Sequence, residues 1–467
     1  MRILTLLAFI LCSVGLSSQE FWTLDKALKH AEENSLSIIQ AQNLIRQSNI
    51  DLSATRQRRL PSLNFSGNHS TSLGRTIDPT TNTFTTESNN NQSLSLSTGI
   101  QLFNGGLLHK QVADAQLFQD ISRLSADATE QDVKLQVVQL FFQALFAQEN
   151  VEIAVSNLKL LDEQMIRTER EVEAGSKPEN ELLEIEAEYA SSEQRLIEAQ
   201  NQQDVGLLRF KQVLQLPVDK EIELGYPDLL DTEIEPWQAL NMTQLRSKAI
   251  SVSPEINAAQ LRIERAQLGI GIAQSQYYPS ISLGGSFSTN FSSVRSQAIP
   301  TGVSIDEQNV YLNGDQVVVG FENPTYRFEP IPYTNQLRDN WGLGLGLSLS
   351  LPIYSQGQIS ANVERAKINH RDAEIQKELQ EQGFREEFEI TITDVKSSYR
   401  SFVAAQKTLD ASTKFFENVN LSFKLGASNS FDLINAQNRK EQAEINLIIA
   451  KYDYLARKKS LGIYLQE

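Results

Sequence analysis

The chain has 467 residues, of which 40% are hydrophobic, and a formal net charge of −16. This composition is typical of a folded protein long enough for several domains or one large one. The acidic balance argues against nucleic acid as a partner, because neutralising phosphates requires clustered Lys and Arg. Beyond the N-terminus no run approaches the roughly 18 apolar residues of a transmembrane helix.

The first 18 residues predict a secretory signal peptide. Arg2 precedes an apolar stretch, and small residues follow as far as Ser18, so cleavage is expected near Ser17 or Ser18. Cys12, the only cysteine, lies inside this segment. A lipoprotein anchor at Cys12 is the alternative, but Ile10-Leu11 stands where small residues would be expected. The mature chain then contains no cysteine and therefore no disulfide.

Two segments of the chain repeat each other. The offset is 218 between Pro61 and Pro279, and it is 251 between Gly106 and Gly357 and again between the later glycines Gly175 and Gly426. The second copy therefore has 33 additional residues between its two strand patterns. A tandem duplication with one expanded loop explains both offsets.

Repeat 1 is expected to comprise residues 19–216, after the signal peptide. A helical pattern ends before Pro61, because the residue preceding a proline is pushed out of the α region. Two stretches that alternate apolar and small residues follow, and then two helical stretches. The expected elements are a helix at 24–59, strands at 61–70 and 92–103, a long helix at 106–174 and a return helix at 179–216.

Repeat 2 is expected to comprise residues 241–467 and to have the same order of elements. Residues 217–240 join the repeats, and their prolines and acidic side chains predict an exposed connector. The expected elements are a helix at 243–276, strands at 280–291 and 341–354, a long helix at 357–425 and a return helix at 430–465.

The long helices have the period of a coiled coil. Leu107 to Ala174 contains neither Gly nor Pro, and a helix of that length measures roughly 100 Å. Apolar residues recur at intervals of seven, as at Leu117 and Leu124, and the phase changes after Leu145. This pattern indicates coiled-coil packing with a change of seam.

The strands have the pattern of a membrane barrel. In 341–354 apolar residues occupy every second position, and only Gly, Ser and Pro stand between them. Strands cross lipid only in a closed barrel, and four strands per chain are too few to close one around a lumen. We therefore expect an α+β membrane protein in which several chains contribute strands to one β-barrel and long helices to a coiled-coil barrel.

Aromatic residues and loops orient this arrangement. Aromatic side chains near the strand ends are typical of a membrane interface. The loops at 71–91 and 292–340 would face outward, with the helices on the other side of the membrane. The expected interface aromatics are Phe103, Tyr277, Tyr278, Trp341 and Tyr354.

The duplicated order of elements is similar to that of the TolC family of outer-membrane factors. The resemblance covers essentially the whole mature chain, and it rests on "LFNGG" and "LPIYSQG" after the second strands and on the glycines Gly175 and Gly426. It implies a homotrimer whose strands form one transmembrane barrel and whose helices form a periplasmic tunnel. It also implies efflux or type I secretion, with a periplasmic adaptor (membrane fusion) protein and an inner-membrane RND, ABC or MFS pump as partners.

The resemblance also implies a constriction beyond the helical turns. The family's first acidic position, six residues past the turn glycine, is Asp432; the second falls on Asn435, and a basic position falls on Ser428, both departures from the pattern. The matching acids of the first copy are Glu181 and Glu184. On a trimer axis each acid would form a ring that favours cations. Alternatively, these are solvated carboxylates at a helix end.

Gly175 and Gly426 are expected to end the long helices, where a permissive backbone is needed. A plain helix C-cap accounts for both glycines. The functional interpretation adds that the two turns dock the adaptor.

The sequence predicts no enzyme: no catalytic motif, no cofactor site and no metal site. Its histidines, His30, His69, His109 and His370, lack metal-ligand spacing. The competing interpretation is a non-conducting trimeric scaffold in the outer membrane or periplasm. Small residues at the inward strand positions favour conduction over that scaffold.

Overall fold

The computed structural model describes residues 20–77, 82–225 and 242–466, so the signal peptide expected at 1–18 lies outside them. The chain forms two compact units, and it passes from one to the other within α2, α3, α6 and α8. The helical unit comprises Met1–Ile50, Gln116–Ala266 and Asn369–Glu467. The strand unit comprises Asp51–Ala115 and Gln267–Ile368.

Each of the two shorter helices expected from sequence is in fact a pair of helices. The first divides at Ser35, which is extended and whose N–H donates to Ala31 O. The second divides at Ser253, because Pro254 excludes the α conformation for the residue before it. The four helices are α1 (Leu24–Asn34), α2 (Leu36–Gln57), α5 (Met242–Val252) and α6 (Pro254–Gln274).

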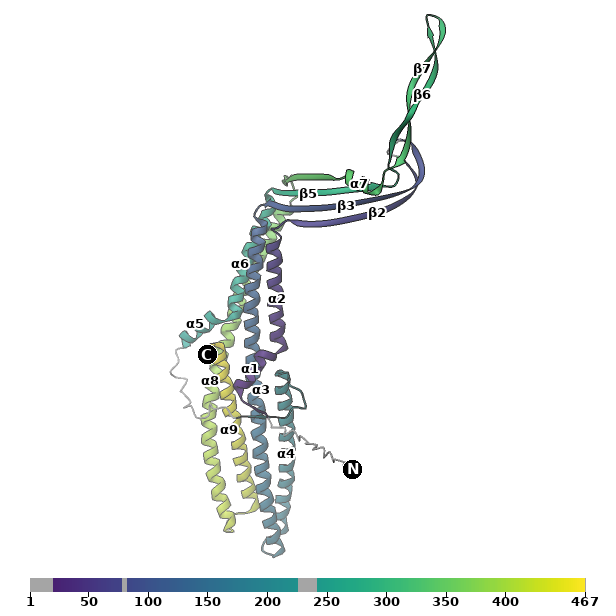
Figure 1. Cartoon of the computed structure of the whole chain (residues 1–467). Helices are drawn as coiled ribbons and strands as arrows, with labels where there is room; N and C mark the ends of the chain where they lie inside the picture. The colour runs from purple at the N-terminus through teal and green to yellow at the C-terminus, as the bar shows by residue number, and fades with distance from the viewer. Residues whose placement is uncertain (1–19, 78–81, 226–241, 467) are drawn as a thin grey trace, which may run out of the picture. The chain divides into compact units, whose positions relative to one another are not determined.

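Four long helices form two antiparallel pairs (Figure 1). They are α3 (Leu107–Glu173), α4 (Glu179–Val213), α8 (Gln358–Lys424) and α9 (Ser430–Tyr464). In α3, Val137, Phe141 and Leu145 are fully buried at intervals of four, the spacing of one helix face. Phe210 of α4 and Tyr452 of α9 belong to the same apolar cluster, so α3 packs against both return helices.

In the described residues, no helix combines the length and apolar content needed to cross a membrane.

Part of the expected connector is buried. β1 (Glu20–Trp22) and β4 (Ile222–Leu224) form a parallel pair in the helical unit. Trp22 is 2% exposed and Leu224 is 1% exposed, because both side chains enter the main apolar cluster. The expectation of an exposed connector is therefore wrong at 222–224, and residues 226–241 lie outside the described chain.

A four-stranded antiparallel sheet dominates the strand unit, in the order β2-β3-β5-β8. The strands are β2 (Ser62–Ile77), β3 (Phe84–Asn104), β5 (Ser280–Ser292) and β8 (Gly342–Ser350). The first two are longer than the sequence indicated. β8 is shorter and stops before Pro352, which has no N–H to donate to the ladder. Tyr354 consequently lies outside the strand.

The expected loop at 292–340 is largely ordered as strands. β6 (Ser296–Leu312) and β7 (Asp315–Pro330) form a long hairpin, and α7 (Tyr333–Asp339) follows it. Figure 1 shows the two strands of this hairpin winding around each other. Asn313 and Gly314 form its tip with φ of 53° and 97°, the left-handed conformation that a two-residue hairpin turn needs.

Candidate functional site

The first helical turn, between α3 and α4, is closed by a glycine. Gly175 has φ of +70°, where an L side chain is strained. Its N–H donates to Val172 O (2.9 Å), and the N–H of Ser176 donates to Glu171 O (2.9 Å). These bonds satisfy carbonyl groups at the end of α3 that have no partner within the helix.

The second turn, between α8 and α9, has the same backbone geometry. Gly426 has φ of +74°, and its N–H donates to Phe423 O (3.0 Å). The N–H of Ala427 donates to Ser422 O (2.8 Å). Both glycines therefore end their helices as the sequence indicated, and a docking role for the turns remains a prediction.

A charged cluster surrounds the first turn. Lys177 Nζ lies 2.9 Å from Glu171 Oε2 and 3.4 Å from Glu181 Oε2. The same ammonium group lies 3.9 Å from the ring centroid of Phe423, a residue of the second long helix. The carboxylate of Glu181 is thus paired with a neighbouring cation, and its place in a ring of like charges remains a prediction.

The second turn holds its acidic residue differently. Asn429 caps α9 by accepting from the Asp432 N–H (2.8 Å). Ser428 Oγ donates to Asp432 Oδ2 (3.2 Å), so Ser428 supports the carboxylate by a hydrogen bond. Asp432 and Asn435 both lie exposed on α9, three positions apart and on one side of the helix. This surface is available to other molecules, and its place at a constriction remains a prediction.

The return helices contact each other just beyond the turns. Ser430, which is 1% exposed, donates from Oγ to Glu184 Oε2 at 2.8 Å. This bond joins the first residue of α9 to α4. The structure therefore engages Glu184 in a link between the two hairpins, a role that its sequence position did not indicate.

Farther along the return helices, an ionic link joins α4 to α9. Arg195 Nη2 lies 2.9 Å from Glu188 Oε1, and Arg195 Nε lies 3.5 Å from Glu441 Oε1. Glu441 is 7% exposed, and burial is the main reason that its pKa is raised above the ordinary range; Arg195 acts in the opposite direction. A buried amide pair, Gln164 Nε2 to Gln437 Oε1 (3.3 Å), joins α3 to α9 nearby.

Sequence reasoning missed this polar link. The sequence gives only a weak signal for this link, because one arginine among the many charged residues of α4 does not identify its partner on another helix. The available indication is a glutamate, Glu441, at an apolar position of a heptad pattern. This position can be recognised only when the buried face of α9 is already known.

The four-stranded sheet has one apolar face. Leu347 of β8 is opposite Leu283 of β5, and Leu283 is opposite Ile100 of β3. Another row contains Leu343, Phe287, Leu96 and Phe65 from all four strands. Ile100 is half-buried and the other named side chains are exposed, Leu347 at 68% and Phe65 at 72%, so the described residues leave most of this face uncovered.

The opposite face of the sheet carries small and polar residues. Gly346, Gly284, Gly99 and Ser62 form one row across the four strands. The next row begins with Gly344 and continues through Ser286, Ser97 and Asn64. A sheet that is apolar on one side and small and polar on the other has the pattern of a strand wall between lipid and water.

The expected interface aromatics lie at the ends of this sheet. Phe103, Tyr277, Tyr278 and Tyr354 are at the end where the strands join the helices, and all are exposed. Tyr278 packs closely on Gly105, where an added Cβ would lie 2.7 Å from the Cβ of Tyr278. Trp341 lies at the other end and stacks on Phe287 with ring centroids 6.1 Å apart. Their contact with a membrane interface remains a prediction.

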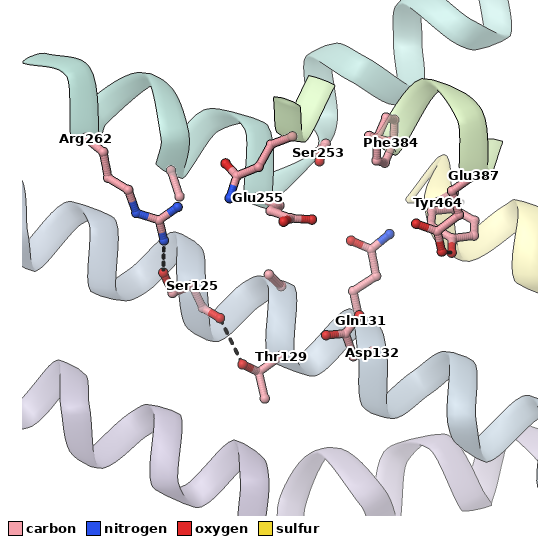
Figure 2. A pocket seen from close by; sticks show the side chains of 13 residues that line it. Ser125, Thr129, Gln131, Asp132, Ser253, Glu255, Arg262, Phe384, Glu387 and Tyr464 are labelled. Atoms are coloured by element: carbon pink, nitrogen blue, oxygen red, sulfur yellow. Dashed lines mark hydrogen bonds between the residues drawn. The ribbon is translucent and has the colours of Figure 1, made fainter. Parts of the chain in front are cut away.

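A polar cavity of about 280 Å³ lies in the helical unit between α3, α6, α8 and α9 (Figure 2). Tyr464 donates to Glu387 Oε1 at 2.6 Å, and burial with this hydrogen bond raises the pKa of the phenol. Burial and the nearby Glu387 also raise the pKa of Asp132. Among the described residues, no cluster of His, Cys, Asp and Glu is arranged to hold a metal ion.

The apolar-faced sheet and the paired helical hairpins are features of the outer-membrane channel class of proteins. The sequence profile of the outer membrane efflux protein family matches residues 27–214 and 245–464. The chain belongs to this family, the TolC family, and the resemblance drawn from the sequence is confirmed. It is an outer-membrane protein whose helices form a tunnel in the periplasm, and its family consists of channels rather than enzymes.

Several known proteins are similar to this chain. Alkaline protease secretion protein AprF of Pseudomonas aeruginosa is 23% identical over 76% of this chain and 65% of its own length. Nodulation protein T of Rhizobium leguminosarum bv. viciae is 22% identical over 92% of this chain and 78% of its own length. The chain thus matches just under two thirds of AprF and a larger share of nodulation protein T.

Solved structures share the fold. The CmeC outer membrane channel of Campylobacter jejuni has a TM-score of 0.75 at 17% identity, covering 95% of this chain and 85% of CmeC. The MtrE outer membrane channel of Neisseria gonorrhoeae has a TM-score of 0.71 at 19% identity, covering 95% of this chain and 88% of MtrE.

Proposed function

We propose that this protein is the trimeric exit duct of an export system. The observation that carries the proposal is the four-stranded sheet, with one exposed apolar face and one face of small and polar residues. Its outer strands, β2 and β8, each pair with a single neighbour among the described residues. Three chains would pair these edges and close a barrel of twelve strands, which removes every free edge from the lipid.

The helical turns form the regulated end of the duct in this proposal. Asp432 and Asn435 would occur three times around the axis, at the narrowest point of the tunnel. The side chains of Glu181 and Glu184 would lie near them, held by Lys177 and Ser430. A periplasmic adaptor would dock against the turns at Gly175 and Gly426, and its contact would separate the hairpins.

The duct itself conducts passively. An inner-membrane pump of the RND, ABC or MFS class would supply the energy and select the cargo. Gly and Ser at the inward strand positions offer little chemistry for selection, so the barrel wall would pass whatever the pump delivers. The names of relatives agree with such variety, since one is an alkaline protease secretion protein and another a cobalt-zinc-cadmium resistance protein.

Single-channel recording of the detergent-extracted protein in a planar bilayer tests this proposal. We expect small, cation-selective openings under a salt gradient. Asp432→Asn should move the reversal potential toward zero, because it removes a ring of negative charge that concentrates cations at the constriction. Asp204→Asn is the matched control, since it removes one exposed carboxylate from α4 away from the turn.

Two outcomes would contradict the proposal. A lipid-inserted oligomer that passes no current, even after Gly426→Val loosens its helical turns, would leave a non-conducting scaffold as the function. Equal effects of Asp432→Asn and Asp204→Asn would retain the channel but remove Asp432 from its constriction.

A further inference from the structure

The four-stranded sheet ends in two strands that each have one free edge. Among the described residues, β2 pairs only with β3 and β8 pairs only with β5. The leucines of β8 are exposed, from 66% at Leu343 to 79% at Leu345. An edge strand is a template for pairing with another chain, and an unpaired edge is costly in lipid. Each of these two edges therefore needs a partner strand.

The directions of the edge strands determine which edges of two copies can pair. Every strand of the sheet is antiparallel to its neighbours, so β2 and β8 run in opposite directions. The chain enters β2 from the end of α2 and leaves β8 toward the start of α8. If two copies have their helices on the same side of a membrane, β8 of one copy can therefore form an antiparallel pair with β2 of the other. An antiparallel pair of two β8 strands would place the helices of the two copies on opposite sides.

The internal duplication reproduces the register of strand pairing. In the first repeat, Ser62 of β2 is opposite Gly99 of β3. Adding the repeat offsets of 218 and 251 to these numbers gives 280 and 350, and Ser280 is opposite Ser350 in the second repeat. The same relation holds for every pair between β5 and β8. The two repeats therefore pair their strands identically.

The pair β3–β5 joins the second strand of one repeat to the first strand of the other. In this pair, Thr98 of β3 is opposite Gly285 of β5. Adding 251 to 98 gives Leu349 on β8, and subtracting 218 from 285 gives Gly67 on β2. In one chain β2 and β8 lie at opposite edges of the sheet with two strands between them. The equivalent pair can therefore form only between β8 of one copy and β2 of another.

This register matches the two faces of the sheet. Leu349 is two positions from Leu347, so both side chains lie on the apolar face. Gly67 is two positions from Phe65 and lies on the same face. Every residue of β8 then has a partner within β2. A slip of one residue would instead set the leucines of β8 beside the polar-face residues of β2.

A glycine supports this register. Gly285 is enclosed from both sides, since an added Cβ would lie 3.3 Å from Thr98 Cγ2 on β3 and 3.2 Å from a leucine of β8. Its counterpart Gly67 is enclosed from one side, where an added Cβ would lie 3.2 Å from Leu94 Cδ2. On the edge side of Gly67 no such contact is found among the described residues. In the register that the duplication predicts, Leu349 of the next copy would lie there, as Thr98 does beside Gly285.

We propose that β8 of one copy pairs with β2 of the next in the register that the duplication predicts. Leu349 then lies opposite Gly67 on the apolar face. Ser348 lies opposite Asn68 on the polar face. This inference rests on the proposed trimer and specifies which residues meet between its copies. Strand pairs between copies and strand pairs inside a chain would then alternate around one barrel with the same register.

Disulfide trapping tests the register on the full-length protein. The mature chain is expected to have no cysteine, so a variant with Asn68→Cys and Ser348→Cys carries only the two introduced thiols. Cβ atoms directly opposite each other lie about 4.5–5.5 Å apart, near the reach of a disulfide, and diagonal ones lie about 7–8 Å apart. Oxidation in detergent should therefore give covalent dimers and trimers on a non-reducing denaturing gel. Within one chain the two thiols are three strand spacings apart, roughly 14 Å, which no disulfide spans.

Two variants that move one thiol along β2 are the matched controls. Ser66→Cys or Ser70→Cys, each combined with Ser348→Cys, keeps both thiols on the polar face and shifts the pairing by two residues. Each control should give less than about a tenth of the cross-linked product, because its thiols are diagonal neighbours.

A second opposed pair repeats the test on the apolar face. His69→Cys is combined with Leu347→Cys, and Thr71→Cys with Leu347→Cys is its control. One face of an antiparallel pair holds the non-hydrogen-bonded positions, whose Cβ atoms are closer. At least one of the two opposed pairs should therefore cross-link about tenfold more than its controls.

Light scattering of the unoxidised variants separates this inference from the proposed duct. A trimer that cross-links equally at opposed and shifted pairs, or at neither, would contradict the register and leave the trimer intact. A monomer would contradict the trimer and, with it, the pairing of β8 with β2.

Discussion

The two helical turns have the same backbone and different electrostatics. Gly175 and Gly426 share a positive φ and the same pair of closing hydrogen bonds. At the first turn, Lys177 neutralises Glu171 and Glu181. At the second, Asp432 is held by hydrogen bonds, and no ion pair to it is found among the described residues.

The comparison teaches that duplication conserved the path of the chain and not its charge. Backbone geometry needs only a glycine and a helix cap, so many sequences satisfy it. The charges are free to differ, and they leave Asp432 as the acid whose field is not cancelled by a neighbour. The two turns can therefore serve different purposes on one scaffold.

Among the variants considered, replacement of the turn glycines should reduce the stability of the protein most. Gly426→Val and Gly175→Val should each destabilise the protein by about 1–2 kcal/mol, because a β-branched residue is strained at positive φ. No atom lies within 4 Å of either added Cβ, so the cost is confined to the backbone. Thermal melting followed by circular dichroism measures the effect.

Gly269→Ala is the control for these variants. Gly269 lies inside α6 with open space around its added Cβ, so alanine should stabilise that helix. We further expect Gly426→Val to reduce export while trimers still form. Normal export, or loss of the trimer, would count against the interpretation of the turns.

Removing one polar side chain from each turn should show that the two turns are stabilised by different interactions. Asn429→Ala should cost about 1 kcal/mol, because α9 loses its cap, and salt should change this little. Lys177→Met should cost about 0.5–1 kcal/mol at low salt and less at high salt, since its ion pairs are screened. Denaturant unfolding at two salt concentrations measures both. An equal salt dependence would show that the turns are held by similar forces.

The smallest expected effect concerns the link between the hairpins. The pKa of Glu441 is raised in the folded chain, so the unfolded chain loses this proton first as the pH rises. The free energy of unfolding therefore falls as the pH rises from the pKa of Glu441 in the unfolded chain to its pKa in the folded chain. It stays at the lower value at any higher pH. Glu441→Gln should raise the melting temperature at pH 7, and the difference should vanish below about pH 4. Glu188→Gln, which leaves Arg195 with Glu441 alone, serves as the comparison variant.

A lower melting temperature for Glu441→Gln at pH 7 would mean that its pairing with Arg195 outweighs its burial. That result would make the link between α4 and α9 a net source of stability.

Much of the fold could be predicted because duplication repeats its signals. The helix-ending prolines, the turn glycines and the alternating leucines of 341–354 each occur in a matching place in the other copy or follow a strong period. The breaks at Ser35 and Ser253 were missed, because an interruption of one residue hardly disturbs a helical pattern. For Ser253 the following proline was the available signal.

The β6–β7 ribbon shows why a region rich in proline can still form strands. Pro300, Pro324 and Pro330 lie in the segment that was expected to be a loop, and proline cannot donate to a ladder. Every strand of a two-stranded ribbon is an edge, so half of its N–H groups need no partner within the ribbon. Asn313-Gly314, between the strand-forming stretches 310–312 and 317–319, was the signal that predicts the hairpin. The link from Arg195 to Glu441 had no comparable signal, since it depends on how separate helices align.

The matched turns have a consequence for the symmetry of an assembly. Three chains with two such hairpins each would present six tips of nearly identical shape around one axis. Only three of the six would carry the ion pairs of Lys177. A partner that recognises the shape of a tip would find sixfold symmetry, and a partner that recognises charge would find threefold symmetry. In the proposed trimer, the duplicated chain would thereby offer partners two different stoichiometries on a single ring.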